Sequence, residues 1–135
     1  MTDHLVDSDA VIDYFKGFPS TVGLIRSLYQ QGDDFCTCDV VIAEVVAGLA
    51  PAERWRGEDL LSSFRFLPTS FSGARQAGLW RYDYARRGLQ LTTTDCLIAA
   101  IALDHSVTPI TGNVAHYPMP EVSVRALPRR GVHGG

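Results

Sequence analysis

LVDSDAVIDYF, residues Leu5–Phe15, joins a short apolar strand to a helix through an acidic turn. Leu5 and Val6 are typical of a buried strand, and the Asp and Ser side chains that follow them are good helix caps. From Ala10 onward the apolar residues recur at helical spacing. Short strands alternate with longer helices along the rest of the chain. This alternation predicts an α/β fold, a three-layer α/β/α domain with a mainly parallel central sheet.

The remaining elements are predicted from the same patterns of apolar and helix-capping residues. We expect strands at 34–37, 65–67, 107–111 and 122–127. We expect helices between Ser20 and Gly32, at 40–50, at 52–64, from Ser70 or Ser72 to near Gly88, and at 96–103. We therefore predict a single domain over residues 1–127, followed by a polar, glycine-rich tail at 128–135 that we expect to be mobile.

Length and composition agree with one compact domain. The chain has 135 residues, 46% apolar and 20% charged, which is enough to bury a core. A net charge of −3 gives no overall attraction to nucleic acid. The three cysteines, with Cys36 and Cys38 separated by one residue, predict buried reduced thiols. Because the sequence contains neither a membrane-spanning apolar run nor a signal-peptide pattern, we expect a cytoplasmic protein with no membrane partner.

Three acidic residues precede or interrupt apolar elements, and the functional hypothesis depends on them. Asp7 directly follows a buried strand, and Asp95 begins the apolar helix CLIAAIAL. Glu44 lies in Val40–Ala50, VVIAEVVAGLA, where every other residue is apolar or glycine, so we expect a helix buried on all sides. Each acid also has a structural interpretation: a solvent-facing stripe for Glu44, and helix capping for Asp7 and Asp95.

In α/β proteins with a parallel sheet, bound ligands lie beyond the carboxyl ends of the strands. We expect both Asp7 and Asn113 at this edge. Clustered carboxylates repel one another unless a cation compensates for their charge. Oxygen ligands suit magnesium, with manganese as a possible substitute. Such a site supports phosphoryl transfer by activating a water and by neutralising charge on the scissile phosphate.

At these residues the sequence resembles the PIN-domain ribonucleases, and within them the VapC toxins of bacterial toxin–antitoxin pairs. LVDSDAVIDYF is similar to the family's first motif, VIAEVVAGL to its second, TTDCLIAAIA to its third and TGNVAHYP to its fourth. In this resemblance the family's acids fall at Asp7, Glu44 and Asp95. Two positions depart from the pattern: Asp9 stands where Asn is frequent, and Asn113 stands where many relatives have Asp. The four motifs follow in order over nearly the whole chain.

The resemblance implies a magnesium-dependent endoribonuclease, the toxin of a type II toxin–antitoxin system, which hydrolyses RNA phosphodiester bonds with a magnesium-activated water. It implies a catalytic set of Asp7, Glu44, Asp95 and Asn113, in which the three acids bind the metal. It further implies a VapB-like antitoxin as partner and a homodimer joined through helices. Because Asn113 is neutral, we expect it to orient water or phosphate, with the Ser8 and Thr111 hydroxyls in support.

Basic side chains offer a way to hold an anionic substrate near acidic residues. Arg81, Arg86 and Arg87 fall late in one helix, where they either pair with RNA phosphates or form a solvated face. No histidine has metal-ligand spacing, but His116 is of interest because it lies close to Asn113.

Two other functions remain open from the sequence. Asp7-x-Asp9 after a strand also resembles haloacid-dehalogenase-like phosphatases, with Asp7 as nucleophile, although the only lysine, Lys16, is early in the chain rather than late. Alternatively, the neutral Asn113 allows a catalytically silent PIN-like interaction module. Stable partner binding without magnesium or manganese binding favours that module.

Overall fold

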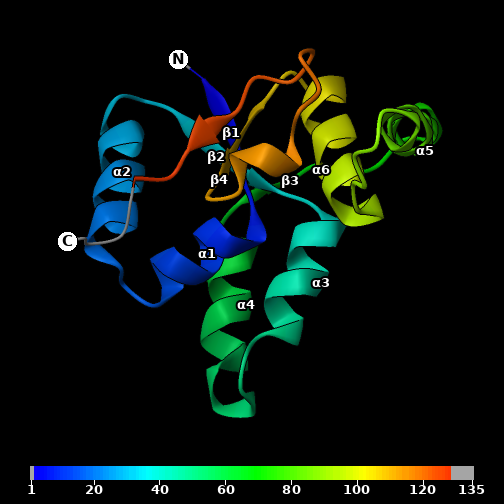
Figure 1. Ribbon diagram of the computed structural model, residues 1–135. Coiled ribbons are helices and arrows are strands. Elements are labelled where there is room, and N and C mark those ends of the chain that lie inside the picture. The colour runs from blue at the N-terminus through cyan, green and yellow to red at the C-terminus, as the bar shows by residue number, and fades with distance from the viewer. Residues whose placement is uncertain (1, 129–135) are drawn as a thin grey trace.

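The structure is a computed structural model that describes residues 2–128, and Figure 1 shows its central sheet surrounded by helices. The strands are β1 (Asp3–Val6), β2 (Asp34–Thr37), β3 (Arg65–Phe66), β4 (Thr108–Thr111) and β5 (Arg125–Ala126). The helices are α1 (Ser8–Phe15), α2 (Pro19–Gln30), α3 (Asp39–Ala47), α4 (Arg54–Ser62), α5 (Phe71–Arg86) and α6 (Thr93–Asp104), with short 3-10 helices η1 (Pro51–Glu53) and η2 (Val114–His116).

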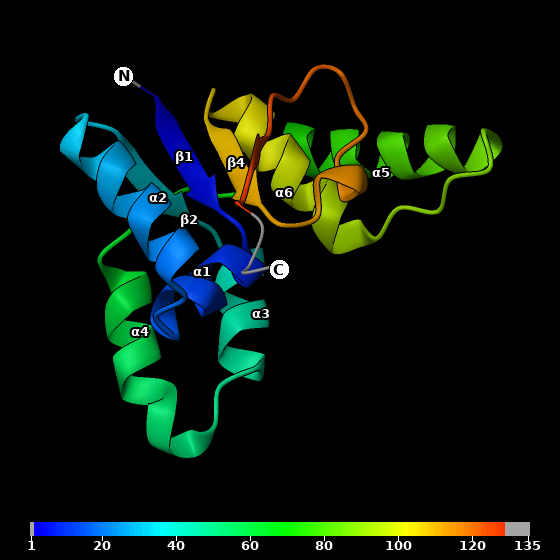
Figure 2. The same cartoon turned by 60° about the vertical axis from the view of Figure 1, so that its left-hand side comes forward.

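The sheet has the strand order β3-β2-β1-β4-β5, and every neighbouring pair is parallel. The α/β prediction is therefore confirmed. Figure 2 shows α2 and α4 on one side of the strands and α5 and α6 on the other. Since β1 is central and Val6 is in register with Ile110, the segments that follow β1 and β4 emerge side by side.

The core is built from apolar side chains of the sheet and of the helices packed on it. Leu5 and Ile110 on the central strands, and Ile98 and Ile101 on α6, are almost completely buried. Burial of side chains this large stabilises the fold by roughly 1.5–3 kcal/mol each. The cysteines Cys36, Cys38 and Cys96 are free and buried, as the sequence predicts.

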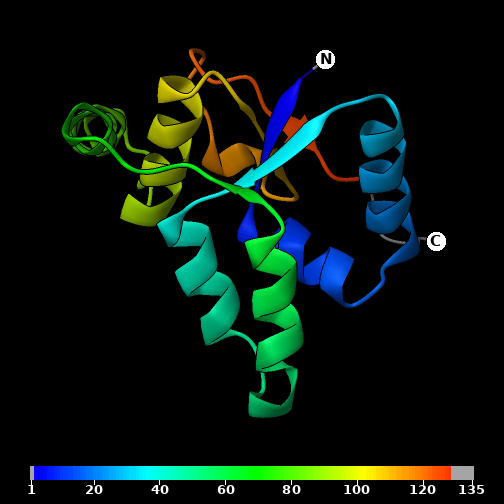
Figure 3. The ribbon, with the colours of Figure 1, turned by 180° about the vertical axis from the view of Figure 1, so that it is seen from behind.

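Helix α3 differs from the prediction of a helix buried on all sides, which is wrong. Only Val41 and Val45 of this helix are buried, and Glu44 lies on its exposed face. Figures 1 and 3 show the reason, because α3 and α4 extend side by side below the sheet and leave much of α3 uncovered. The alternative of a solvent-facing stripe describes this helix better. Its apolar exposed residues, such as Ala43 and Ala47, form a surface without a covering element among residues 2–128.

The predicted element boundaries are accurate to within a few residues, with two informative differences. Helix α2 begins at Pro19, after an extended Phe18, so Ser20 is not its cap. Proline suits the first helical position because its missing N–H has no partner there. The predicted strand at 122–127 is reduced to the short β5.

Most of the tail predicted at 128–135 lies outside the described residues. Within residues 2–128, none of the helices has the length and hydrophobicity that crossing a bilayer requires.

Candidate functional site

Four carboxylates approach one another beyond the carboxyl ends of β1 and β4, and we call them the acidic site: Asp7, Asp9, Glu44 and Asp95. They come from the β1–α1 junction, the middle of α3 and the first turn of α6. The parallel sheet explains this convergence, since strand ends of the same polarity meet at one edge. Asn113 follows β4 at the same edge.

Asp7 is the most buried of these acids, at 5% exposed. Its Oδ1 atom accepts a 2.8 Å hydrogen bond from the backbone N–H of Ser8, and therefore caps α1. Its Oδ2 atom accepts a 2.7 Å hydrogen bond from the hydroxyl of Tyr117. Capping therefore uses only one of the two oxygens, and the other is turned into the site.

Glu44 reaches the acidic site from the exposed face of α3. Glu44 is an exposed residue, but partial desolvation by its neighbours raises its pKa, a hydrogen bond from the Ser8 side chain lowers it, and the charges of Asp7, Asp95 and Asp9 raise it further. The net result is a pKa above the ordinary glutamate value. A carboxylate in this setting gains from a nearby cation.

Asp95 lies in the first turn of α6 without capping it. Its backbone N–H donates to the hydroxyl of Thr92, 3.1 Å away, so Thr92 is the N-cap. The Asp95 carboxylate is instead 3.2 Å from Nδ1 of His116 and is 17% exposed. Thr92 therefore caps α6 in place of Asp95, while the charge of Asp95 in the first turn still complements the helix dipole.

Asp9 is a member of the site that the sequence interpretation left among the capping residues. Its Oδ2 atom accepts hydrogen bonds from the backbone N–H of Gly112, at 2.8 Å, and from the side-chain amide of Asn113, at 3.2 Å. Burial and the charge of Asp7 raise its pKa above the ordinary aspartate value, although the Gly112 and Ala10 amides lower it. The Asp7-x-Asp9 spacing was the available sequence signal.

Asn113 is held by the same contacts. Its backbone N–H donates to Oγ1 of Thr111 at 3.0 Å, and its side-chain amide points to Asp9. The hydroxyl of Thr111 therefore contacts Asn113, and the hydroxyl of Ser8 contacts Glu44.

The donor set fits a hard divalent cation, because it consists of carboxylate oxygens from several elements. In the present side-chain arrangement, no three His, Cys, Asp or Glu side chains of residues 2–128 form a ready-made metal shell. Each carboxylate also has a partner within the protein, through a hydrogen bond for Asp7, Asp9 and Glu44 and through ion-pair contact with His116 for Asp95. A bound cation would offset the negative charge that raises the pKa values of Asp9 and Glu44.

Arg81 has a structural role in the loop that leads to Asp95. Its Nε donates to the carbonyl of Leu91 at 3.0 Å, and its Nη1 donates to Oγ1 of Thr93 at 2.8 Å. Arg86 and Arg87 stack over the rings of Tyr82 and Tyr84, each 4.2 Å from the ring centroid. Arg81 thus anchors the start of α6.

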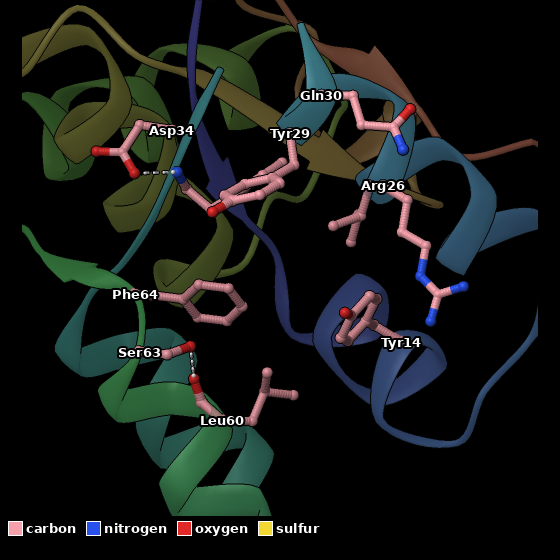
Figure 4. A pocket seen from close by; sticks show the side chains of 10 residues that line it. Tyr14, Arg26, Tyr29, Gln30, Asp34, Leu60, Ser63 and Phe64 are labelled. Carbon is pink, nitrogen blue, oxygen red and sulfur yellow. Dashed lines mark hydrogen bonds between the residues drawn. The ribbon is translucent and has the colours of Figure 1, made fainter. Parts of the chain in front are cut away.

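A hollow elsewhere on the surface, the α2–α4 groove, has a volume of about 580 Å³ and shares no lining residue with the acidic site. Figure 4 shows Leu60 and Phe64 on one side of it, and Tyr14, Arg26 and Tyr29 on the other. Its lining is mainly apolar and aromatic, with charged residues at the margin. Tyr29 is 72% exposed, which is unusual for a large aromatic side chain.

An all-parallel α/β domain with carboxylates gathered at one sheet edge is the architecture of a PIN domain. Residues 4–117 match the PIN domain family, so the chain belongs to it. Within that family it belongs to the VapC-type ribonuclease toxins of type II toxin–antitoxin systems. Nucleases of this family are typically metal-dependent.

Two curated relatives and one solved structure illustrate the similarity. The chain is 35% identical over 115 residues to ribonuclease VapC10 of Mycobacterium tuberculosis, covering 85% of this chain and 86% of that protein. It is 29% identical over 117 residues to ribonuclease VapC19 of the same organism, covering 85% and 92%. The fold is similar to VapBC2 from Rickettsia felis bound to a promoter DNA fragment, with a TM-score of 0.80, 18% identity and coverage of 94% and 100%.

Proposed function

We propose that this protein is a magnesium-dependent endoribonuclease that hydrolyses RNA phosphodiester bonds at the acidic site. The observation that carries the proposal is the approach of Asp7, Asp9, Glu44 and Asp95 to one another at the carboxyl edge of the sheet, where neighbouring charges raise the pKa values of Asp9 and Glu44. Four carboxylates in one site repel one another and so destabilise the protein when no metal is bound. A bound cation relieves this repulsion. The similarity to VapC10 and VapC19 supports RNA as the substrate.

Asp7, Glu44 and Asp95 are the residues that we propose as metal ligands, with manganese as a possible substitute for magnesium. When bound there, the cation supplies Lewis-acid chemistry, lowering the pKa of a water and neutralising charge on the scissile phosphate. Asp9 adds a further negative charge at the site, and its carboxylate is fixed by Gly112 and Asn113. Asn113 is proposed as part of the catalytic set because its side-chain amide orients the Asp9 carboxylate.

The antitoxin is proposed to be a VapB-like protein that docks in the α2–α4 groove. Support comes from the exposed Tyr29 and the apolar lining residues Leu60 and Phe64, which offer a helix-sized apolar surface away from the acidic site. The Rickettsia felis relative was solved as a VapBC pair. Because RNA is the substrate, we propose the cytoplasm as the compartment.

A homodimer is proposed through the uncovered face of α3. Ala43 and Ala47 are exposed on this helix, and Ile42 and Val46 are only half-buried. A second copy that covers this face removes apolar surface from water, at a gain of roughly 25 cal/mol per Å².

The phosphatase interpretation is less well supported. Both oxygens of Asp7 accept hydrogen bonds, from Ser8 and from Tyr117, which makes the carboxylate a poor free nucleophile. Lys16 caps the opposite end of α1 from Asp7 and is exposed. A phosphatase of that kind requires a lysine beside the nucleophile, and this arrangement does not provide one.

Cleavage of RNA with and without magnesium tests the proposal and separates it from a silent interaction module. We expect the wild-type protein to cleave only with magnesium, and Asp7→Asn and Glu44→Gln to lose most of that activity. Asp59→Asn, an exposed acid on α4, is the matched control and should keep it. Equal cleavage by all four proteins without metal would contradict the proposal. Antitoxin binding by a protein that neither cleaves RNA nor binds magnesium would support the silent module.

A further inference from the structure

Segment 112–117 contacts three of the four carboxylates of the acidic site. The backbone N–H of Gly112 and the side chain of Asn113 donate to Asp9, His116 lies beside Asp95, and the hydroxyl of Tyr117 donates to Asp7. These acids come from two different parts of the chain, near residue 8 and at the start of α6. One short segment therefore fixes the relative positions of carboxylates that repel one another.

The contact of Tyr117 is specific to its hydroxyl. The side chain is 4% exposed, so its ring belongs to the core. Its hydroxyl is 2.7 Å from Oδ2 of Asp7, a short distance that is typical of a charge-assisted hydrogen bond. Burial and the charge of Asp7 raise the pKa of Tyr117 above its ordinary value. A phenylalanine would fill the same space without this bond.

The contact of His116 lies at the open side of the site. Its ring is 53% exposed, and Nδ1 is 3.2 Å from Oδ2 of Asp95. An exposed ring contributes little to the core, so packing does not explain its orientation. The short η2 helix sets this orientation, because it places adjacent residues beside two different carboxylates.

We propose that His116 and Tyr117 are positioning residues, which hold the carboxylates of Asp95 and Asp7 in the orientation that receives the metal ion. This inference rests on the proposed function, because the two residues can position metal ligands only if the acidic site binds a cation. Hydrogen-bond partners of metal ligands fix ligand orientation, and their loss typically weakens metal affinity or activity by about 10–100-fold. The hydroxyl of Tyr117 occupies such a position beside Asp7, and the imidazole of His116 lies within ion-pair distance of the Asp95 carboxylate.

Metal affinity distinguishes this role from a purely structural one. We expect Tyr117→Phe to bind magnesium about 10–100-fold more weakly in calorimetry and to cleave RNA with a lower kcat, while KM for RNA changes little. Manganese binding, followed by electron paramagnetic resonance, should show the same loss without any dependence on catalysis. Tyr84→Phe, at another buried tyrosine, should bind both metals as the wild type does.

His116 provides a test that does not depend on a core residue. We expect His116→Ala to weaken magnesium binding and His116→Asn, whose amide nitrogen can replace Nδ1, to recover part of it. His105→Ala is the control, because His105 bonds to the carbonyl of Pro68, away from the acidic site. Wild-type magnesium affinity in both Tyr117→Phe and His116→Ala overturns the inference, even if their melting temperatures fall. A wild-type protein that binds no magnesium, or Asp7→Asn binding it normally, overturns the proposed function itself.

Discussion

The side-chain amide of Asn113 donates a 3.2 Å hydrogen bond to Oδ2 of Asp9, joining two positions that both depart from the pattern of the family. The sequence has an acid at residue 9, where Asn is frequent in the resemblance, and an amide at residue 113, where Asp is frequent. Because the two side chains touch, the exchange keeps one carboxylate and one amide at the same place. Compared with a site that has Asn at residue 9 and Asp at residue 113, the acidic site therefore has the same number of carboxylates.

Exchanging these two side chains tests whether one carboxylate at either position is enough for magnesium binding. We expect Asp9→Asn to weaken magnesium binding on the order of tenfold, because it removes a carboxylate. The double variant Asp9→Asn with Asn113→Asp should recover most of that affinity. Residues in direct contact show coupling free energies of about 0.5–3 kcal/mol, which calorimetry of the four proteins resolves.

The variant Asn113→Asp alone supplies the control for this exchange. It places a second carboxylate against Asp9, so we expect a lower melting temperature without metal than in the wild type, and a larger rise on adding magnesium. Additive effects of the two single changes on metal affinity would show that the positions act independently and would contradict this interpretation.

Glu44 makes the stability of the protein depend on pH in a direction opposite to that of most carboxylates. Burial and the charges of Asp7, Asp95 and Asp9 raise its pKa in the folded state. Between the ordinary and the raised values, the folded protein binds more protons than the unfolded chain does. The free energy of unfolding therefore falls as the pH rises through that window, and the ionised carboxylate destabilises the apo protein at neutral pH.

We accordingly expect Glu44→Gln to melt at a higher temperature than the wild type at pH 7 without metal. The advantage should disappear below the ordinary pKa of glutamate, where both side chains are neutral. Added magnesium should stabilise the wild type more than the variant, since bound ligand stabilises only the state that binds it. Glu58→Gln, on the exposed surface of α4, controls for loss of charge alone. An unchanged melting temperature at pH 7 would show that Glu44 is not under electrostatic strain.

The parts of the fold that local sequence determines were predictable. The strand, turn and helix of Leu5–Phe15 follow from apolar spacing and capping residues, and the parallel sheet follows from the repeated alternation. The placement of Asp7 and Asn113 at one edge could be inferred because parallel strands end at a common edge. The exposure of Glu44 could not, because an apolar sequence does not reveal how many elements cover a helix.

Contacts distant in sequence account for the other differences. Asp9 meets Gly112 and Asn113 only because β1 and β4 are neighbours with Val6 opposite Ile110. A capping side chain and a site carboxylate have the same sequence pattern, so the sequence did not reveal that Asp9 also lies in the site. The hydrogen bond from Tyr117 to Asp7 likewise depends on the register of the sheet.

The α2–α4 groove leads to a prediction about the antitoxin that is separate from catalysis. Tyr29 lies in this groove and is 72% exposed, so Tyr29→Ala should not disturb the core. Large aromatic side chains contribute strongly to protein interfaces, and truncation of such an anchor commonly costs about 2 kcal/mol or more of binding free energy. We expect Tyr29→Ala to bind the antitoxin encoded by an adjacent short reading frame about 30-fold more weakly.

The matched control is Phe71→Ala, which truncates an 88% exposed aromatic residue at the start of α5, outside the groove. It should bind the antitoxin as the wild type does, and both variants should keep magnesium affinity and RNA cleavage, because neither residue belongs to the acidic site. Surface plasmon resonance with the purified antitoxin measures the difference. Wild-type affinity in Tyr29→Ala, with a loss of affinity in Phe71→Ala, would contradict docking in the α2–α4 groove. The antitoxin would then bind at α5, on the opposite side of the sheet.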